Sequence, residues 1–134
     1  IHHPDLQTEL RVPGSIQPIQ ADPHRLGQVI ENLVSNAIKY APGSKIKVTL
    51  VQDQDNTFID VQDYGAGIPE KYLQFIFERF FRITDQDSVV RGSGLGLFIC
   101  KQIIKAHGGE IWAISPAGQG TTIRIQLPGQ PGLK

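Results

Sequence analysis

The sequence has one cysteine, no excess of charge of either sign and no long apolar run, and each absence excludes a class of protein. The single cysteine, Cys100, excludes a disulfide framework and a cysteine zinc site, and its apolar surroundings predict a buried thiol. The 13 basic and 13 acidic residues cancel, so we expect no broad basic face for nucleic acid. No apolar stretch approaches the roughly 20 residues that span a membrane.

The remaining composition is typical of one globular domain. The chain has 134 residues, of which 40% are hydrophobic and 19% charged, and a domain of this length buries roughly two-thirds of its unfolded surface. The first residues contain neither a secretion signal nor an initiator methionine. We therefore expect a single cytoplasmic domain over residues 1–134, with a core of about 6–128, that is a fragment of a larger protein.

The spacing of apolar residues predicts an alternation of strands and helices. Alternation predicts strands over 6–12, 16–20, 45–51, 57–61, 110–115 and 121–127. Helical spacing predicts helices over 23–40, 70–81 and 95–106. Asp22 is the expected N-cap of the first helix, with Pro23 at its first position. The layout predicts an α+β fold, a two-layer sandwich in which about three helices cover one face of a mixed, mostly antiparallel sheet.

The first long helix carries a polar stripe beside its apolar face. Asn32, Asn36 and Lys39 are four and three residues apart, so they share one side of the helix. An amide oxygen suits a magnesium ion that keeps several waters, and a lysine supplies a compact charge for phosphate. The alternative for this stripe alone is an ordinary solvated face.

A carboxylate stands at the end of the predicted strand 57–61, and two glycines follow it. Asp63 can accept a hydrogen bond from an exocyclic amine, and Gly65 and Gly67 allow the backbone to approach a flat ligand. Taken alone, the same pattern also fits a simple strand-to-helix turn.

Glycines at every second position, Gly92, Gly94 and Gly96, open the last predicted helix. Free amides at a helix N-terminus bind phosphate, although the spacing matches neither a dinucleotide fingerprint nor a P-loop. The polar segment 83–94 before this helix is long enough for a mobile flap. Just before the flap, Arg79 and Arg82 can face one way, so that one of them reaches a phosphate.

Together these motifs resemble the catalytic domain of histidine kinases, in the superfamily of gyrase, heat-shock chaperone and mismatch-repair ATPases with the Bergerat-type ATP-binding fold. The resemblance covers about residues 6–128 and comprises five elements in order: an N box at 24–42, a glycine box at Asp63, Gly65 and Gly67, an F box at 77–82, a second glycine box at Gly92, Gly94 and Gly96, and a last element at Gly118, Gly120 and Thr121.

The resemblance implies ATP and Mg²⁺ as cofactors and assigns roles to individual residues. Asp63 would bind the adenine amine, with Thr121 or Thr122 acting through water. Asn36 would be the main magnesium ligand, and Asn32, Lys39 and Arg82 would form the catalytic set. The whole implied site consists of Asn32, Asn36, Lys39, Tyr40, Asp63, Gly65, Gly67, Ile68, Phe80, Arg82, Gly92, Ser93, Gly94, Leu95, Gly96, Leu97, Thr121 and Thr122.

Two departures from the wider superfamily refine the expected reaction. Asn32 stands where hydrolysing relatives carry a glutamate that activates water, so water attack is unassisted, as expected of a kinase. None of His2, His3, His24 and His107 has the helical, acid-flanked setting of a phosphate acceptor, and His107 instead suits the C-terminus of a helix electrostatically. We therefore expect the acceptor histidine to lie on a domain outside this chain.

The function expected from the resemblance is transfer of the γ-phosphate of Mg-ATP to a histidine on the protein's own dimerisation domain, from which a response regulator receiver domain takes it. The isolated domain would be a monomer, the full protein a homodimer, and its location the cytoplasm, either free or as part of a membrane-bound sensor. No contact with nucleic acid or membrane is expected. The alternatives are an anti-sigma-factor-type serine kinase and a non-catalytic nucleotide-binding module, although the intact Asn36, Lys39, Asp63 and lid glycines oppose a degenerate site.

Overall fold

The computed structural model describes residues 8–11, 19–81 and 95–129. Its elements follow one another as β1 (Thr8–Arg11), α1 (Pro23–Tyr40), β2 (Ile46–Gln52), β3 (Asn56–Asp63), α2 (Glu70–Leu73), α3 (Gly96–Ala106), β4 (Glu110–Ile114) and β5 (Thr121–Pro128). None of the helices in these ranges is long and apolar enough to cross a membrane.

The five strands form one mixed sheet in the order β1-β2-β3-β5-β4. β1 runs parallel to β2, and every other neighbouring pair is antiparallel. The predicted hairpins β2–β3 and β4–β5 are confirmed. Because β5 enters between β3 and β4, the last residue of β3, Asp63, pairs with the first residue of β5, Thr121.

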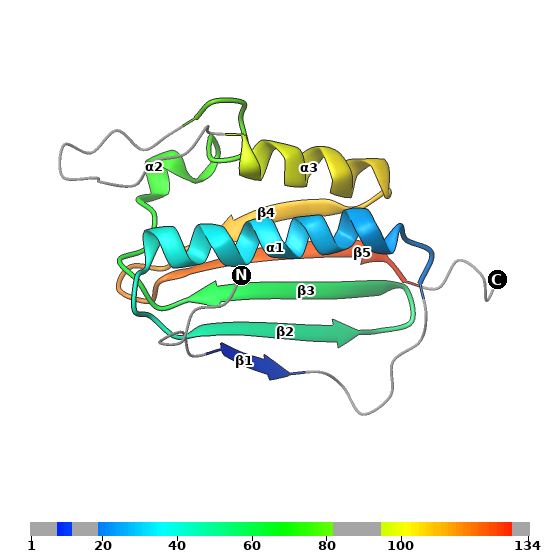
Figure 1. Cartoon of the computed structure of the whole chain (residues 1–134), viewed down its shortest axis with the longest axis horizontal. Helices are drawn as coiled ribbons and strands as arrows, with labels where there is room; N and C mark the ends of the chain where they lie inside the picture. Colours follow the sequence, from blue (N-terminus) through cyan, green and yellow to red (C-terminus); the bar gives the residue numbers. More distant parts are fainter. Residues whose placement is uncertain (1–7, 12–18, 82–94, 130–134) are drawn as a thin grey trace.

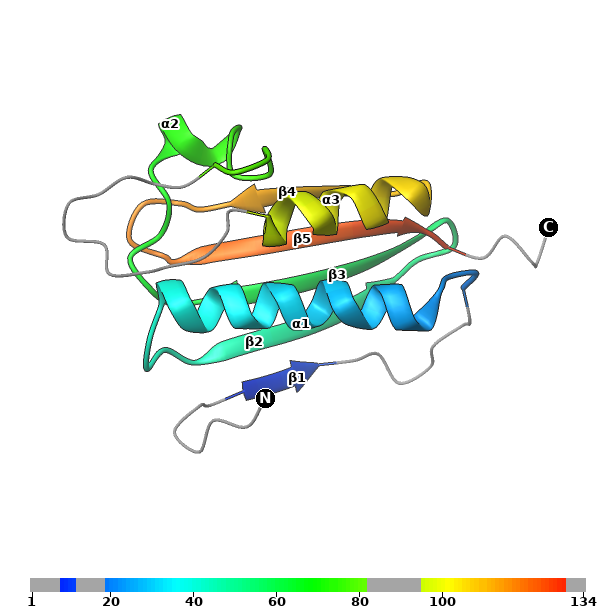
Figure 2. The same cartoon turned by 45° about the horizontal axis from the view of Figure 1, so that its top comes forward.

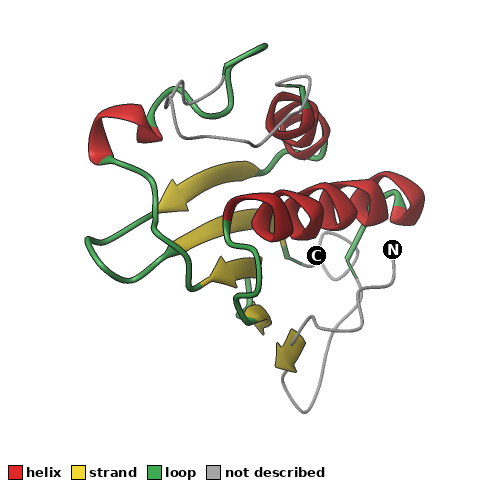
Figure 3. Cartoon of the chain, turned by 60° about the vertical axis from the view of Figure 1, so that its left-hand side comes forward, coloured by secondary structure: helices red, strands yellow, loops and turns green. Residues whose placement is uncertain are grey.

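The molecule has two layers, with α1 and α3 side by side on one face of the sheet (Figures 1 and 2). Figure 3 shows the sheet and the helices as separate layers, with the one-turn helix α2 at the edge. Fully buried side chains fill the space between the layers, among them Leu33 and Val29 from α1, Ile104 and Cys100 from α3, and Ile125 from β5. The predicted α+β sandwich and the buried Cys100 thiol are both confirmed.

The start of α1 follows the predicted capping chemistry. Asp22 Oδ1 accepts hydrogen bonds from the backbone N–H groups of His24 at 3.0 Å and Arg25 at 3.1 Å, and Pro23 occupies the first position of the helix. These bonds satisfy amides that no helical carbonyl can reach. The helix ends at Tyr40, before the predicted Ala41-Pro42-Gly43 stop.

The predicted helix over 70–81 is wrong beyond its first turn. Only Glu70–Leu73 is helical, and the backbone then continues in turns that repeat every three residues, with the N–H groups of Phe75, Glu78 and Phe81 each bonded to the carbonyl three residues earlier. Aromatic packing explains the departure, since the Phe81 ring lies 6.0 Å from the ring of Phe75 and 6.0 Å from that of Tyr72.

Two smaller expectations also change. Ile19 and Gln20 lie in no strand, and the rest of the predicted strand 16–20 falls outside the described residues.

His107 does sit at the C-terminus of α3, but its Nε2 accepts the Asp22 N–H at 3.0 Å and its Nδ1 lies 2.8 Å from the Ile103 carbonyl. His107 therefore forms a hydrogen-bonded bridge between the start of α1 and the end of α3.

The cap of α1 gives a test of these contacts. Asp22→Ala is expected to lower the free energy of unfolding by about 1 kcal/mol, because two first-turn amides lose their acceptor. Asp22→Asn keeps an oxygen acceptor and should stay within a few tenths of a kcal/mol of the wild type. Urea denaturation of the three proteins measures the difference. An equal loss in both variants would show that the charge of Asp22 matters and its capping bonds do not.

Candidate functional site

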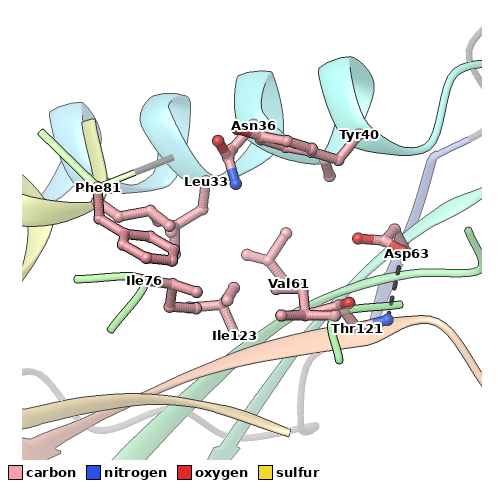
Figure 4. Close-up of a pocket in the computed structure, with 12 residues that line it drawn as sticks. Leu33, Asn36, Tyr40, Val61, Asp63, Ile76, Phe81, Thr121 and Ile123 are labelled. Atoms are coloured by element: carbon pink, nitrogen blue, oxygen red, sulfur yellow. Dashed lines mark hydrogen bonds between the residues drawn. The ribbon is translucent and has the colours of Figure 1, made fainter. Parts of the chain in front are cut away.

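A cavity of ≈ 570 Å³, including the space at its mouth, lies between the helices and one end of the sheet. This volume falls in the range of small-molecule pockets. Its walls are mostly apolar, with a few polar groups at one end (Figure 4). The lining residues are Leu33, Asn36, Ala37 and Tyr40 from α1, Val61 and Asp63 from β3, Ile68, Ile76 and Phe81 from the following segment, Leu97 from α3, and Thr121 and Ile123 from β5.

Asp63 is the buried charged group of this cavity, with only 8% of its surface exposed. Its Oδ1 accepts hydrogen bonds from the Gly65 N–H at 3.0 Å and the Thr121 N–H at 3.3 Å. Burial raises the pKa of the Asp63 carboxyl above its ordinary value, and the two backbone bonds act in the opposite direction. Both bonds engage Oδ1, and the carboxyl points into the cavity (Figure 4), so an incoming donor would meet Oδ2.

Three glycines let the chain close around Asp63. A Cβ at Gly65 would come within 2.5 Å of Ala41 Cβ, and a Cβ at Gly120 would collide with the Asp63 carbonyl oxygen. Gly67 has a φ of +84°, a conformation that side chains disfavour. Gly65 and Gly67 do not line the cavity. Their described contacts are close packing against neighbouring atoms, and their approach to a ligand stays a prediction.

Two serines that the sequence analysis missed hold the loop after Asp63. Ser44 Oγ accepts the Tyr64 N–H at 2.9 Å and donates to the Lys45 carbonyl at 2.8 Å. Ser115 Oγ accepts the Ile68 N–H at 2.8 Å from a residue 47 positions away. The only sequence signal for either serine is its place beside a turn, Pro42-Gly43 for Ser44 and Pro116 for Ser115.

The fold brings six of the predicted site residues to the cavity. They come from four separate parts of the chain: Asn36 and Tyr40, Asp63 and Ile68, Leu97, and Thr121. In Figure 4, Asn36 and Tyr40 project from α1 over the sheet residues Val61 and Ile123, while Asp63 and Thr121 close one end. Residues from four segments therefore converge on one apolar space with a carboxylate at its end.

Other predicted residues lie elsewhere in the described structure. Thr122 alternates with the buried Thr121 and Ile123 along β5, so its side chain points to the opposite face of the sheet. Lys39 is exposed, and Phe80 is 65% exposed with a φ of +65°. Leu95 and Gly96 begin α3 without lining the cavity.

The two F-box arginines differ in what the structure describes. Arg79 stacks on the Phe98 ring of α3, with Cζ 4.8 Å from the ring centre. Arg82, Gly92, Ser93 and Gly94 fall outside the described residues, as does the predicted flap 83–94.

Asn32 contacts Cys100 of α3 and is not among the residues that line the cavity. Burial raises the pKa of the Cys100 thiol to about 11, and a hydrogen bond with the Asn32 side chain acts in the opposite direction. The same thiol donates to the Val29 carbonyl at 3.7 Å. Asn32 and Asn36 lie four residues apart on one side of α1, as predicted. Asn32 contacts α3, whereas Asn36 lines the cavity.

The raised pKa of Asp63 predicts a dependence of stability on pH. Because folding favours the protonated carboxyl, ionisation lowers the free energy of unfolding as pH rises from the ordinary pKa of 3.8 through the higher folded value. Asp63→Asn cannot ionise. The stability of the wild type relative to Asp63→Asn should therefore fall as the pH rises above the ordinary pKa of 3.8. Urea unfolding at a series of pH values measures this, and a wild type that gains on the variant would contradict it.

Comparison with known proteins agrees with this architecture. Residues 21–131 match the model of the histidine kinase-, DNA gyrase B- and HSP90-like ATPases. The chain is 42% identical over 119 residues to the adaptive-response sensory kinase SasA of Synechococcus elongatus, over 87% of this chain and 30% of SasA. The chain thus spans less than a third of the length of that relative.

Solved structures show the same fold. The catalytic domain of the histidine kinase ThkA superposes with a TM-score of 0.81 at 32% identity, over 97% of this chain and 82% of that domain. Full-length ShkA, solved in complex with AMPPNP, gives a TM-score of 0.80 at 27% identity, over 93% of this chain and 26% of ShkA.

The fold is that of the α/β-sandwich ATP-binding domains of histidine kinases. The chain belongs to the histidine kinase-, DNA gyrase B- and HSP90-like ATPase family, and the relatives named above are sensory and histidine kinases. The family resemblance identified from the five motifs is confirmed, and the anti-sigma-factor alternative is not favoured.

Proposed function

We propose that this domain binds Mg-ATP in the cavity at the ends of β3 and β5 and donates its γ-phosphate to a histidine on a separate dimerisation domain. The observation that carries the proposal is the buried Asp63 carboxyl, which points into an apolar cavity (Figure 4). A buried acceptor of this kind is satisfied by a ligand that brings a hydrogen-bond donor on a flat apolar body.

The adenine ring fits the end of the cavity that holds Asp63. Val61 and Ile123 form an apolar floor, and Tyr40 projects from α1 above them. The exocyclic amine of adenine can donate to Asp63 Oδ2, because Oδ1 already accepts two backbone N–H groups. Thr121, which lines the cavity beside Asp63, is in reach of the same edge of the base.

The triphosphate would extend from this end toward Asn36 and the start of α3. Leu97, in the first turn of α3, lines the cavity, so the positive end of that helix dipole lies beside it. Lys39 would add a positive charge at the exposed rim. We assign Arg82 and the glycines Gly92, Gly94 and Gly96 to the same phosphate region on the family resemblance.

Asn36 is the residue that fits a magnesium ion. The described ranges contain no group of three or more His, Cys, Asp or Glu side chains that could hold a metal. Mg²⁺ tolerates such a setting, since it keeps several waters and binds through a few oxygens together with substrate phosphates. The Asn36 amide oxygen would supply the protein ligand, and the ion would neutralise charge on the phosphates.

The chain's own residues would position the phosphates without activating water. Asn32 is an amide and cannot act as a general base, and it is engaged with Cys100 at the interface of α1 and α3. Positioning and charge neutralisation are most of what phosphoryl transfer requires from a protein. Such a site would favour transfer of the phosphate to an acceptor over hydrolysis of ATP to free phosphate.

The acceptor and later partners would lie outside this chain. The match covers 30% of SasA, which leaves room in such a relative for a dimerisation domain with the acceptor histidine. A response regulator receiver domain would take the phosphate next, and the full protein would act as a homodimer in the cytoplasm, where ATP is available.

The adenine assignment predicts a strong effect of Asp63 and none of its neighbour Thr122. Asp63→Ala is expected to weaken ATP binding by about ten- to a hundredfold, since a hydrogen bond to a charged group contributes roughly 1.5–3 kcal/mol. Thr122→Ala is the matched control, because its side chain faces away from the cavity. Calorimetric titration with ATP and GTP measures both. Equal affinity for the two nucleotides, or an unaffected Asp63→Ala, would disprove the assignment.

The separate-acceptor proposal predicts what this domain cannot do alone. The isolated domain should bind ATP without labelling itself and should hydrolyse it slowly. With its own dimeric helical domain added in trans, it should label that domain's histidine slowly, because the tether and its effective concentration are lost. Radiolabelled ATP is the probe, and the histidine-to-alanine acceptor is the control. Acid-labile label on the isolated domain would contradict the proposal, and label on the control acceptor would indicate a serine kinase.

A further inference from the structure

Ser115 joins three separate segments at the end of the cavity. Its Oγ lies 2.8 Å from the Ile68 backbone nitrogen, 2.7 Å from the Gly120 carbonyl oxygen and 3.2 Å from Thr121 Oγ1. Ser115 itself does not line the cavity, but Ile68 and Thr121 do. Any effect of Ser115 on a bound nucleotide must therefore pass through these two neighbours.

The chemistry of the three partners fixes the direction of each hydrogen bond. The Ile68 N–H can only donate, so it occupies one lone pair of Ser115 Oγ. The Gly120 carbonyl can only accept, so it takes the single hydroxyl proton of Ser115. One lone pair of Ser115 remains for Thr121, and the Thr121 hydroxyl must donate to it.

Thr121 consequently has no proton left for the cavity. Its hydroxyl presents lone pairs only, in a side chain that is 6% exposed and begins β5 opposite Asp63. Asp63 Oδ2, next to it, is also an acceptor while the carboxyl is ionised. This end of the cavity therefore offers two neighbouring acceptors, one charged and one neutral.

We propose that Ser115 is a positioning residue that determines base specificity by holding Thr121 as a hydrogen-bond acceptor toward the nucleotide. The proposal rests on the proposed adenine site. Two acceptors favour a base whose facing group is an amine, as in adenine, or a water that donates to both. A 6-oxo purine would place a carbonyl oxygen against them and leave buried acceptors unpaired, which costs binding free energy.

ATP and ITP are the appropriate pair of probes, because at this edge ITP carries a 6-oxo group in place of the 6-amine. In Ser115→Ala the Thr121 hydroxyl is released and can rotate to donate to the 6-oxo group. The ratio of ATP to ITP affinity should then fall by about three- to tenfold, the range expected of one neutral hydrogen bond. Ser115→Thr retains the hydroxyl and should restore the wild-type ratio.

Ser44 provides a matched control within the same loop. Its hydroxyl also accepts a backbone N–H, that of Tyr64, but its described bonds do not involve Thr121. Ser44→Ala should therefore weaken ATP and ITP to the same extent and leave their ratio unchanged. Thr121→Val covers the case in which Ser115→Ala does not fold, because it removes the hydroxyl and leaves Ser115 in place. The ratio should fall in Thr121→Val, and adding Ser115→Ala should lower it no further.

The experiment is calorimetric titration of the folded variants with ATP and with ITP. A wild type that prefers ATP, with a lowered ratio in Ser115→Ala or Thr121→Val and an unchanged ratio in Ser44→Ala, supports the proposal. A wild type that prefers ATP but keeps its ratio in both Ser115→Ala and Thr121→Val overturns the role of Ser115 and leaves the adenine site intact. A wild type that binds ATP and ITP equally overturns the adenine site and, with it, this proposal.

Discussion

The pair of backbone hydrogen bonds on Asp63 Oδ1 is the constraint around which the rest of the site is arranged. An acidic residue that is only 8% exposed is costly unless donors meet its carboxyl. The donors come from Gly65, two residues later, and from Thr121, 58 residues later. Asp63 therefore fixes the loop that follows β3 and the start of β5 at the same point, and it still has Oδ2 directed toward the cavity.

The surrounding sequence is adapted to let the backbone reach that point. Gly65 leaves room for Ala41 at the end of α1, and Gly120 leaves room for the carbonyl of Asp63. Ser44 and Ser115 then hold the same loop from two sides through its N–H groups. The glycines around Asp63 thus let the backbone pack closely against a buried acid that borders the cavity.

The two halves of α1 have different tasks. In its first half Val29 packs fully buried beside Cys100 of α3, so the helices and the sheet share a dry core. In its second half Asn36 and Tyr40 face the cavity, where no α3 residue beyond Leu97 intervenes among the lining residues. Asn32, between the two halves, belongs to the helix interface through Cys100. One amphipathic helix therefore stabilises the fold at one end and forms the site wall at the other.

Local patterns in the sequence determined α1 with its Asp22 cap, both hairpins, the buried Cys100 and the family, because capping, alternation and helical spacing act over a few residues. Asp63 and Asn36 were also identifiable, since a carboxylate before spaced glycines and an amide on a helical stripe are local signals. Only the tertiary structure decided that the backbone beyond Leu73 leaves the helix and that Asn32 contacts α3. It also decided that Thr121 and not Thr122 lines the cavity, and that Ser115 reaches Ile68. The alternation of residues along β5 indicates that Thr121 lies on the buried face of the strand. The pairing of β5 with β3 then determines that Thr121 lies opposite Asp63. The contacts of Ser115 with Ile68 and of Cys100 with Val29 join residues 47 and 71 positions apart. No local propensity encodes such distant partners, because they meet only when the layers pack.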